Sequence, residues 1–118
     1  MKERYSAVIK TVTYNKTSGD SPGLTVTLDK VTWNSKYSDG NDEDPVLNPV
    51  VKWETVHLGD VLVLVDPGNG FHKLPLADFP EYVKTSVDQA KSMDGFITPF
   101  SVYYVGDKPV ALVEWYIP

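Results

Sequence analysis

The sequence contains no cysteine, which excludes disulfides, thiol catalysis and zinc–thiolate sites together. It also lacks a run of eighteen apolar residues and a basic segment followed by a short apolar one, so we expect neither a membrane span nor a secretion signal. Arginine is nearly absent: the sequence contains one arginine, Arg4, and ten lysines, and the formal net charge is −5. Because arginine and basic patches supply most phosphate and base recognition, direct binding to nucleic acid is disfavoured.

The remaining composition is that of an ordinary globular protein. Of the 118 residues, 42% are hydrophobic, 12% are aromatic and 23% are charged. These values suit a folded chain with its own core rather than a disordered one. We therefore expect a single domain over residues 1–118.

Most of the first half is patterned as strands. Residues 5–14 are rich in Val, Thr and Tyr, and a polar turn separates them from residues 24–33. Apolar and polar residues alternate in the second segment until Lys30, after which Val31 and Trp33 occupy the formerly polar parity. A β-bulge at Lys30 would reconcile the two halves.

The second half adds further β-rich segments. Residues 50–56 and 61–65 flank Gly59-Asp60, a dipeptide typical of a hairpin turn. The five consecutive apolar residues of 61–65 indicate a strand buried on both faces. A terminal hairpin is expected between residues 100 and 117.

One helix is predicted over residues 78–93. Asp78 and Glu81 have the spacing of a capping box. The apolar stripe that follows consists of Phe79, Val83, Val87 and Ala90. The expected fold class is thus mainly β with one helix (α+β), a small bent sheet or barrel with the order of about β-β-β-β-α-β-β.

The loop over residues 35–49 concentrates acidic side chains. Its carboxylates are Asp39, Asp42, Glu43 and Asp44. Their spacing around Gly40 does not fit an EF-hand, and the other acids of the chain are interleaved with lysine, which does not favour mimicry of phosphates. A solvated loop is the simpler interpretation, and its length indicates docking on a partner.

Motifs for catalysis are missing. His57 and His72 are the only histidines, and a metal site would need both of them with a carboxylate such as Asp60, but no ligand spacing supports it. No nucleophile motif surrounds Ser86 or Ser101. We therefore expect a protein that is not an enzyme, with no catalytic, cofactor-binding or metal-binding residues.

Aromatic residues lie on or beside the expected strands. Tyr and Trp are enriched at interfaces, although packing in the core is the simpler role for any one of them. Tyr103 and Tyr104 are adjacent on a strand and must point to opposite faces. The candidate partner-binding residues are Tyr37, Trp53 and Tyr104, with the acidic side chains Asp39, Asp42, Glu43 and Asp44.

The segment PVVKWETVHLGDVLVLVDPGNG, residues 49–70, resembles the small barrel domains of bacteriophage tail-spike and baseplate proteins. The segment SAVIKTVTYNKTSGDSPGLTVTL, residues 6–28, is similar to the first two strands of such domains. The pattern is shared with other oligonucleotide/oligosaccharide-binding-type barrels. The resemblance implies an assembly role in a virion and no catalytic residues.

These observations predict a non-enzymatic structural or assembly module that acts through protein–protein contacts, as a component of a phage virion. Its partners would be proteins, a second copy of the chain among them, and it would reside in the virion or the host cytoplasm without contacting a membrane. The alternative is a small acidic inhibitor, of the anti-defence or immunity type, whose loop blocks a basic site. A third hypothesis is a hydrolase or metal enzyme built on His57 and His72.

Overall fold

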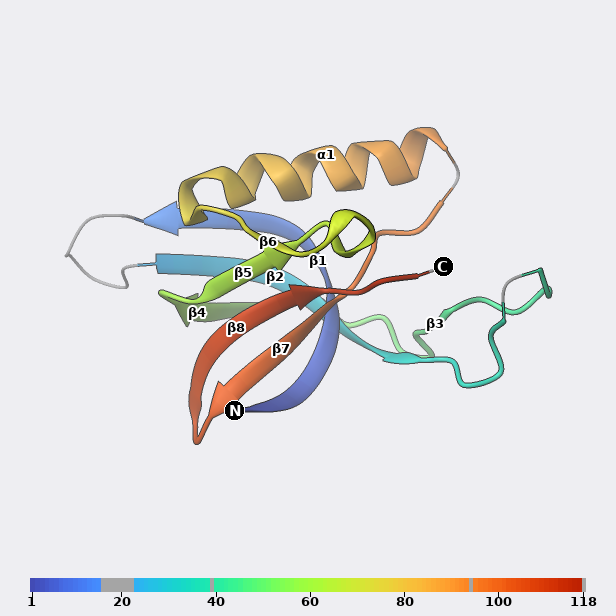
Figure 1. Ribbon diagram of the computed structural model, residues 1–118, viewed down its shortest axis with the longest axis horizontal. Coiled ribbons are helices and arrows are strands. Elements are labelled where there is room, and N and C mark those ends of the chain that lie inside the picture. The colour runs from blue at the N-terminus through green and yellow to red at the C-terminus, as the bar shows by residue number, and fades with distance from the viewer. Residues whose placement is uncertain (16–22, 39, 94, 118) are drawn as a thin grey trace.

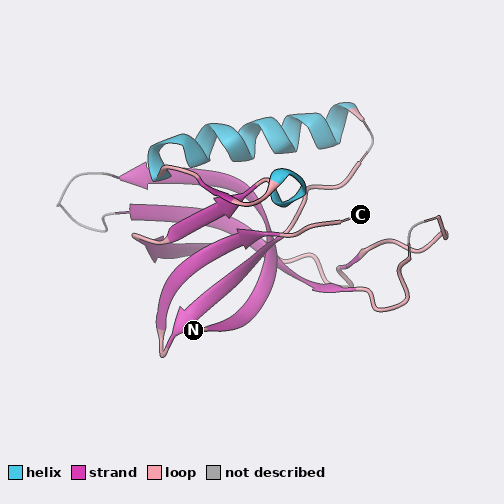
Figure 2. Ribbon diagram, viewed as in Figure 1, coloured by secondary structure: helices cyan, strands magenta, loops and turns pink. Residues whose placement is uncertain are grey.

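The computed structural model describes residues 1–15, 23–38, 40–93 and 95–117 (Figure 1). In this part of the chain, the strands are β1 (Lys2–Asn15), β2 (Gly23–Trp33), β3 (Val46–Leu47), β4 (Glu54–Gly59), β5 (Leu62–Val65), β6 (His72–Lys73), β7 (Phe100–Val105) and β8 (Lys108–Glu114). The helix α1 spans Phe79–Ser92, and the short 3-10 turns are η1 (Pro67–Asn69) and η2 (Leu76–Asp78). Strands predominate (Figure 2), which confirms a mainly β fold with one helix. The order differs from the expected one by the two-residue strands β3 and β6.

The strands form one curled, open and mixed sheet. The hydrogen-bonded order is β3-β2-β1-β7-β8-β5-β6, and β4 also pairs with β2. The pairing of β5 with β8 is parallel and the other pairings are antiparallel. The predicted hairpin at Gly59-Asp60 is wrong, because β4 pairs with β2 while β5 pairs with β8. The dipeptide instead connects two strands that belong to distant parts of the sheet.

Two register shifts bend β1. Lys10 is the extra residue in the pairing with β2, and Arg4 is the extra residue in the pairing with β7. The residues of β1 that contribute to the core are Tyr5, Ala7 and Ile9 before Lys10, and Val12 and Tyr14 after it. The bulge therefore changes the parity of the strand and keeps its apolar side chains on the inner face.

The predicted bulge at Lys30 is wrong, because β1 and β2 pair regularly across that residue. The apolar phase changes there for another reason. Asp29 and Val31 point to the face opposite Leu28, yet both are buried. They lie with Val46 and Val51 around one pocket, so the chain that follows β2 covers a second apolar layer on the outer side of the sheet.

The helix α1 closes the inner core. Phe79 and Val83 are buried, and the Phe79 ring packs edge-to-face on Phe100 with 5.4 Å between centroids. The predicted apolar stripe thus faces the sheet. The predicted capping box does not form, because Asp78 has helical backbone angles (φ −92°, ψ −12°) and its side chain caps no amide. The turn η2 runs directly into α1, which removes the extended residue that a cap needs.

Candidate protein-binding surface

The strand β5 buries only one of its faces. Val63 and Val65 are fully buried, whereas Leu62, on the opposite face, is 38% exposed and Leu64 is partly exposed. Burial of residues 61–65 on both faces was the expectation, and Leu62 contradicts it. The sequence is typical of a strand that is buried on both faces, but the described residues cover only one face of β5.

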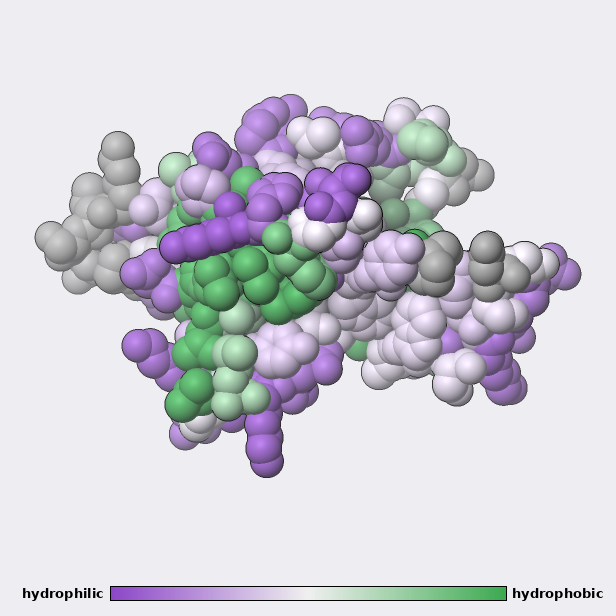
Figure 3. All heavy atoms as spheres, in the orientation of Figure 1, coloured by the Kyte–Doolittle hydropathy of each residue, from purple (hydrophilic) through white to green (hydrophobic). Residues whose placement is uncertain are grey.

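The outer face continues from β5 across β8 and β7 to β1. Side chains paired across neighbouring strands lie on the same face, so the register defines its rows. One row consists of Lys73, Leu64, Val113, Ser101 and Ser6. The next row consists of Leu62, Ala111, Tyr103 and Glu3. We call these two rows the open face; Figure 3 shows a continuous apolar surface over β5 and β8.

Hydrogen bonds fix the border of the open face at β1. The indole Nε1–H of Trp115 donates to Ser101 Oγ at 3.0 Å and to Ser6 Oγ at 3.2 Å. Ser6 Oγ in turn donates to Glu3 Oε1 at 2.8 Å. These bonds hold the Glu3 carboxylate and the Trp115 ring in place.

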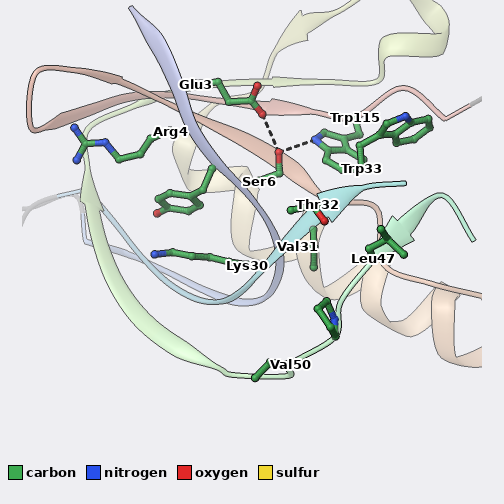
Figure 4. Close-up of a pocket in the computed structure, with 12 residues that line it drawn as sticks. Glu3, Arg4, Ser6, Lys30, Val31, Thr32, Trp33, Leu47, Val50 and Trp115 are labelled. Carbon is green, nitrogen blue, oxygen red and sulfur yellow. Dashed lines mark hydrogen bonds between the residues drawn. The ribbon is translucent and has the colours of Figure 1, made fainter. Parts of the chain in front are cut away.

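A groove of about 640 Å³ adjoins this border (Figure 4). Arg4 and Lys30 lie at one end of the groove, and Trp33 and Leu47 lie at the other. The Trp33 ring packs edge-on against Trp115, with 5.6 Å between centroids, and remains 43% exposed. The groove therefore combines cationic side chains with an accessible aromatic ring.

The cations of the groove rest on tyrosine rings. The Arg4 guanidinium lies 4.0 Å from the Tyr104 ring centroid, and the Lys30 ammonium lies 4.7 Å from that of Tyr5. The tyrosine rings also contact each other, with 6.2 Å between centroids. Burial, followed by a hydrogen bond with Tyr104, raises the pKa of the Tyr5 phenol, so Tyr5 stays neutral at physiological pH.

A buried carboxylate attaches the segment 48–52 to β2. Asp29, which is 2% exposed, accepts a hydrogen bond from Asn48 Nδ2 at 2.6 Å and another from the backbone N–H of Lys52 at 3.1 Å. Buried charges require such partners. Asp29 therefore fixes the chain that covers the outer layer of β2.

A buried amide performs the same task for the acidic loop. Asn34 Nδ2 donates to the carbonyl oxygen of Asp44 at 2.8 Å and to Glu43 Oε2 at 3.3 Å. The backbone N–H of Asn34 donates to the carbonyl oxygen of Pro45 at 3.0 Å. The side chains of Asp42, Glu43 and Asp44 are nevertheless exposed, so the loop displays its charge from a braced base.

The predicted partner-binding residues do not form one cluster. Tyr37 packs edge-on against Trp33, with 5.5 Å between centroids. Trp53 is 40% exposed and lies with Asp44 around a pocket of about 340 Å³. Tyr104 lies beneath Arg4, in the cation–tyrosine cluster of the groove. Asp39 lies outside the described residues.

Sequence reasoning did not single out Asp29, Asn34 or Leu62 as parts of this surface. A signal existed for Asp29. It lies between Leu28 and Val31, two apolar residues that point to opposite faces of the strand, and this pattern indicates that both faces are buried at this point. Leu62 was missed because residues 61–65 were expected to form a strand that is buried on both faces. The network of Trp115 joins residues about a hundred positions apart, and no local pattern encodes it.

The histidines lie on separate strands. His57 Nδ1 is 3.1 Å from Thr25 Oγ1, and His72 is exposed on β6. Among the described residues, no group of three or more His, Asp or Glu side chains could hold a metal ion. In the same residues, no helix is long and apolar enough to cross a membrane.

No family model matches the chain, and no curated protein or solved structure matches it either. The resemblance to phage barrel domains therefore stays a prediction. The open face and the adjoining groove are the features of the structure that bear on function.

Proposed function

We propose that the protein is a non-enzymatic structural or assembly module that acts through protein–protein contacts. The observation that carries the proposal is the open face, where Leu62, Leu64 and Val113 form an uncovered apolar surface. Contiguous apolar patches of this kind mark interaction sites on soluble proteins. The accessible Trp33 ring beside this face adds a residue type that is enriched where binding energy concentrates.

A phage virion is the setting that the resemblance to tail-spike and baseplate domains adds to this proposal. The protein would then reside in the particle or, before assembly, in the host cytoplasm. Its partners would be other proteins of the particle, further copies of the chain included. Nucleic acid is a poor partner for a chain of net charge −5 with a single arginine.

Sedimentation of cell extracts through a density gradient tests this proposal in the cells that make the protein. The wild-type protein should sediment with large particles, and the variant Leu62→Lys should move to the top of the gradient. Met93→Lys is the matched control, because Met93 is 79% exposed at the end of α1 and lies in neither the open face nor the groove. Wild-type protein that remains at the top would overturn the proposal.

A second candidate function is a small acidic inhibitor that blocks a basic site on another protein. It is supported by Asp42, Glu43 and Asp44, which are exposed on a loop braced by Asn34. Replacing these three acids by their amides would abolish binding by an inhibitor, whose affinity would also fall steeply with salt. An assembly module held by the open face would keep its particle association after the same change.

A further inference from the structure

We infer that the open face binds a second copy of the chain, related by a two-fold axis that runs parallel to β8 between the two apposed faces. The inference rests on the proposed function, because it names the partner of the same surface. Two properties of the face support it: the position of its charges and its apolar centre.

The charges of the open face are self-complementary about β8. Within its two rows, the charged side chains are Lys73 on β6 and Glu3 on β1, and each of these strands lies two places from β8. Neighbouring strands are about 4.8 Å apart, so each charge lies roughly 10 Å to one side of the axis. The two-fold rotation therefore places Lys73 of one copy over Glu3 of the other, twice in each dimer.

The remaining offset between these charges is short. Lys73 shares a row with Leu64, whereas Glu3 shares a row with Leu62, two residues away along the strand. Two residues correspond to about 6.6 Å, which a lysine side chain can span. A two-fold axis perpendicular to the strands would instead place Lys73 over Lys73, so the charges select the axis parallel to β8.

The centre of the face is apolar under the same rotation. Ala111 and Val113 lie on the axis strand, and Leu62 and Leu64 lie on one side of it with Tyr103 on the other. The rotation thus brings Leu62 of each copy toward Tyr103 of its partner, and Leu64 toward Ser101 and the Trp115 indole that is hydrogen-bonded to it. Sheets that pack face to face lie about 10 Å apart, a separation filled by side chains of this size.

Analytical ultracentrifugation of the purified full chain, over a range of concentrations, tests the inference. The wild-type protein should form a dimer. Lys73→Glu and Glu3→Lys should each raise the dimer dissociation constant about 30-fold, because attraction becomes repulsion at two symmetric contacts. The double variant that carries both changes should recover the wild-type constant within about threefold, since each exchanged charge again meets its opposite.

Two controls separate a lost contact from a lost fold. Lys91→Glu changes the same charge at the exposed end of α1 and should leave the dissociation constant unchanged. Leu62→Lys should weaken the dimer by roughly 100-fold, whereas Met93→Lys should not. Circular dichroism should be the same for all variants.

A wild-type chain that stays monomeric at several hundred micromolar would overturn the inference. So would single charge reversals that weaken the dimer without recovery in the double variant, because the two charges would then not meet. A monomer that nevertheless sediments with particles through Leu62 would leave the proposed function intact and assign the open face to a different protein. Loss of both dimer and particle association would remove the proposed function as well.

Discussion

Replacing Asp29 with alanine should release the segment 48–52 from β2. The carboxylate of Asp29 is 2% exposed and accepts hydrogen bonds from Asn48 Nδ2 at 2.6 Å and from the Lys52 N–H at 3.1 Å. A hydrogen bond to a charged group contributes about 1.5–3 kcal/mol. Because Asn48 is exposed and its amide can bind water after the change, we take the lower values and expect a total loss of about 3 kcal/mol.

The loss can be measured in two ways. Urea denaturation followed by circular dichroism reports the free energy of unfolding of the whole chain. Hydrogen exchange at the Lys52 amide reports the local bond, and a loss of about 3 kcal/mol corresponds to exchange roughly 150-fold faster. Asp29→Asn keeps one acceptor oxygen and should cost only about 1 kcal/mol.

Asp42→Ala is the control, since Asp42 is exposed and a surface change of this kind stays within about 0.5 kcal/mol. The role of the Asp29 carboxylate in holding the segment 48–52 would be refuted if the free energy of unfolding of Asp29→Ala stayed within about 1 kcal/mol of the wild-type value and hydrogen exchange at the Lys52 amide were unchanged. Faster exchange at Lys52 with little change in global stability would show that the segment detaches locally while the sheet stays folded.

Three further changes test the packing and its pH dependence. Gly23→Ala should lower the free energy of unfolding, measured by thermal denaturation, by about 3 kcal/mol or more, because Gly23 has φ +94° and a Cβ there would overlap the backbone of Gly59. Gly40→Ala is the control: Gly40 has φ +91° but lies in open space, so the loss should be only about 1–2 kcal/mol. Tyr82→Phe should lower the free energy of unfolding by about 2 kcal/mol, measured in urea, since the phenol donates to both carboxylate oxygens of Glu114 at 2.8 and 2.9 Å. Burial, and then the bond to Glu114, raises the pKa of Tyr82, so the folded state holds this proton more tightly than the unfolded state. The contribution of the Tyr82 phenol to the free energy of unfolding is therefore complete below pH of about 10 and falls above it by up to about 1.4 kcal/mol per pH unit. Between pH 9 and 12, the urea midpoint of Tyr82→Phe should fall less steeply with pH than that of the wild type. Equal slopes would contradict the raised pKa of Tyr82.

Local patterns were sufficient to predict the longer elements of this fold, but not the two-residue strands β3 and β6. The helix at Phe79–Ser92 follows from its apolar stripe, and the terminal hairpin follows from two β-rich segments around Gly106-Asp107. The bulge at Lys10 was also encoded, because the apolar parity of β1 changes there. The change of phase at Lys30 was noticed but assigned to a bulge, since a second apolar layer on the outer face produces the same pattern.

Strand partners and the open face could not be predicted in the same way. The parallel pairing of β5 with β8 joins Leu62 to Ala111, and no local signal states which strand completes which edge. A continuous apolar strand indicates that both of its faces are buried, but it does not indicate whether the residues that bury them belong to the same chain. Leu62 became informative only when the structure showed which face of β5 the described residues leave exposed.

The position of the last two strands has a consequence during synthesis. The strand β1 pairs with β2 early in the chain, but its other edge waits for β7, and β5 waits for β8. From Trp33 to Val105 the ribosome must add 72 residues, which takes roughly 4–14 s at ordinary rates of elongation. Throughout that interval the nascent hairpin presents an unpaired strand edge, which is open to pairing with other chains.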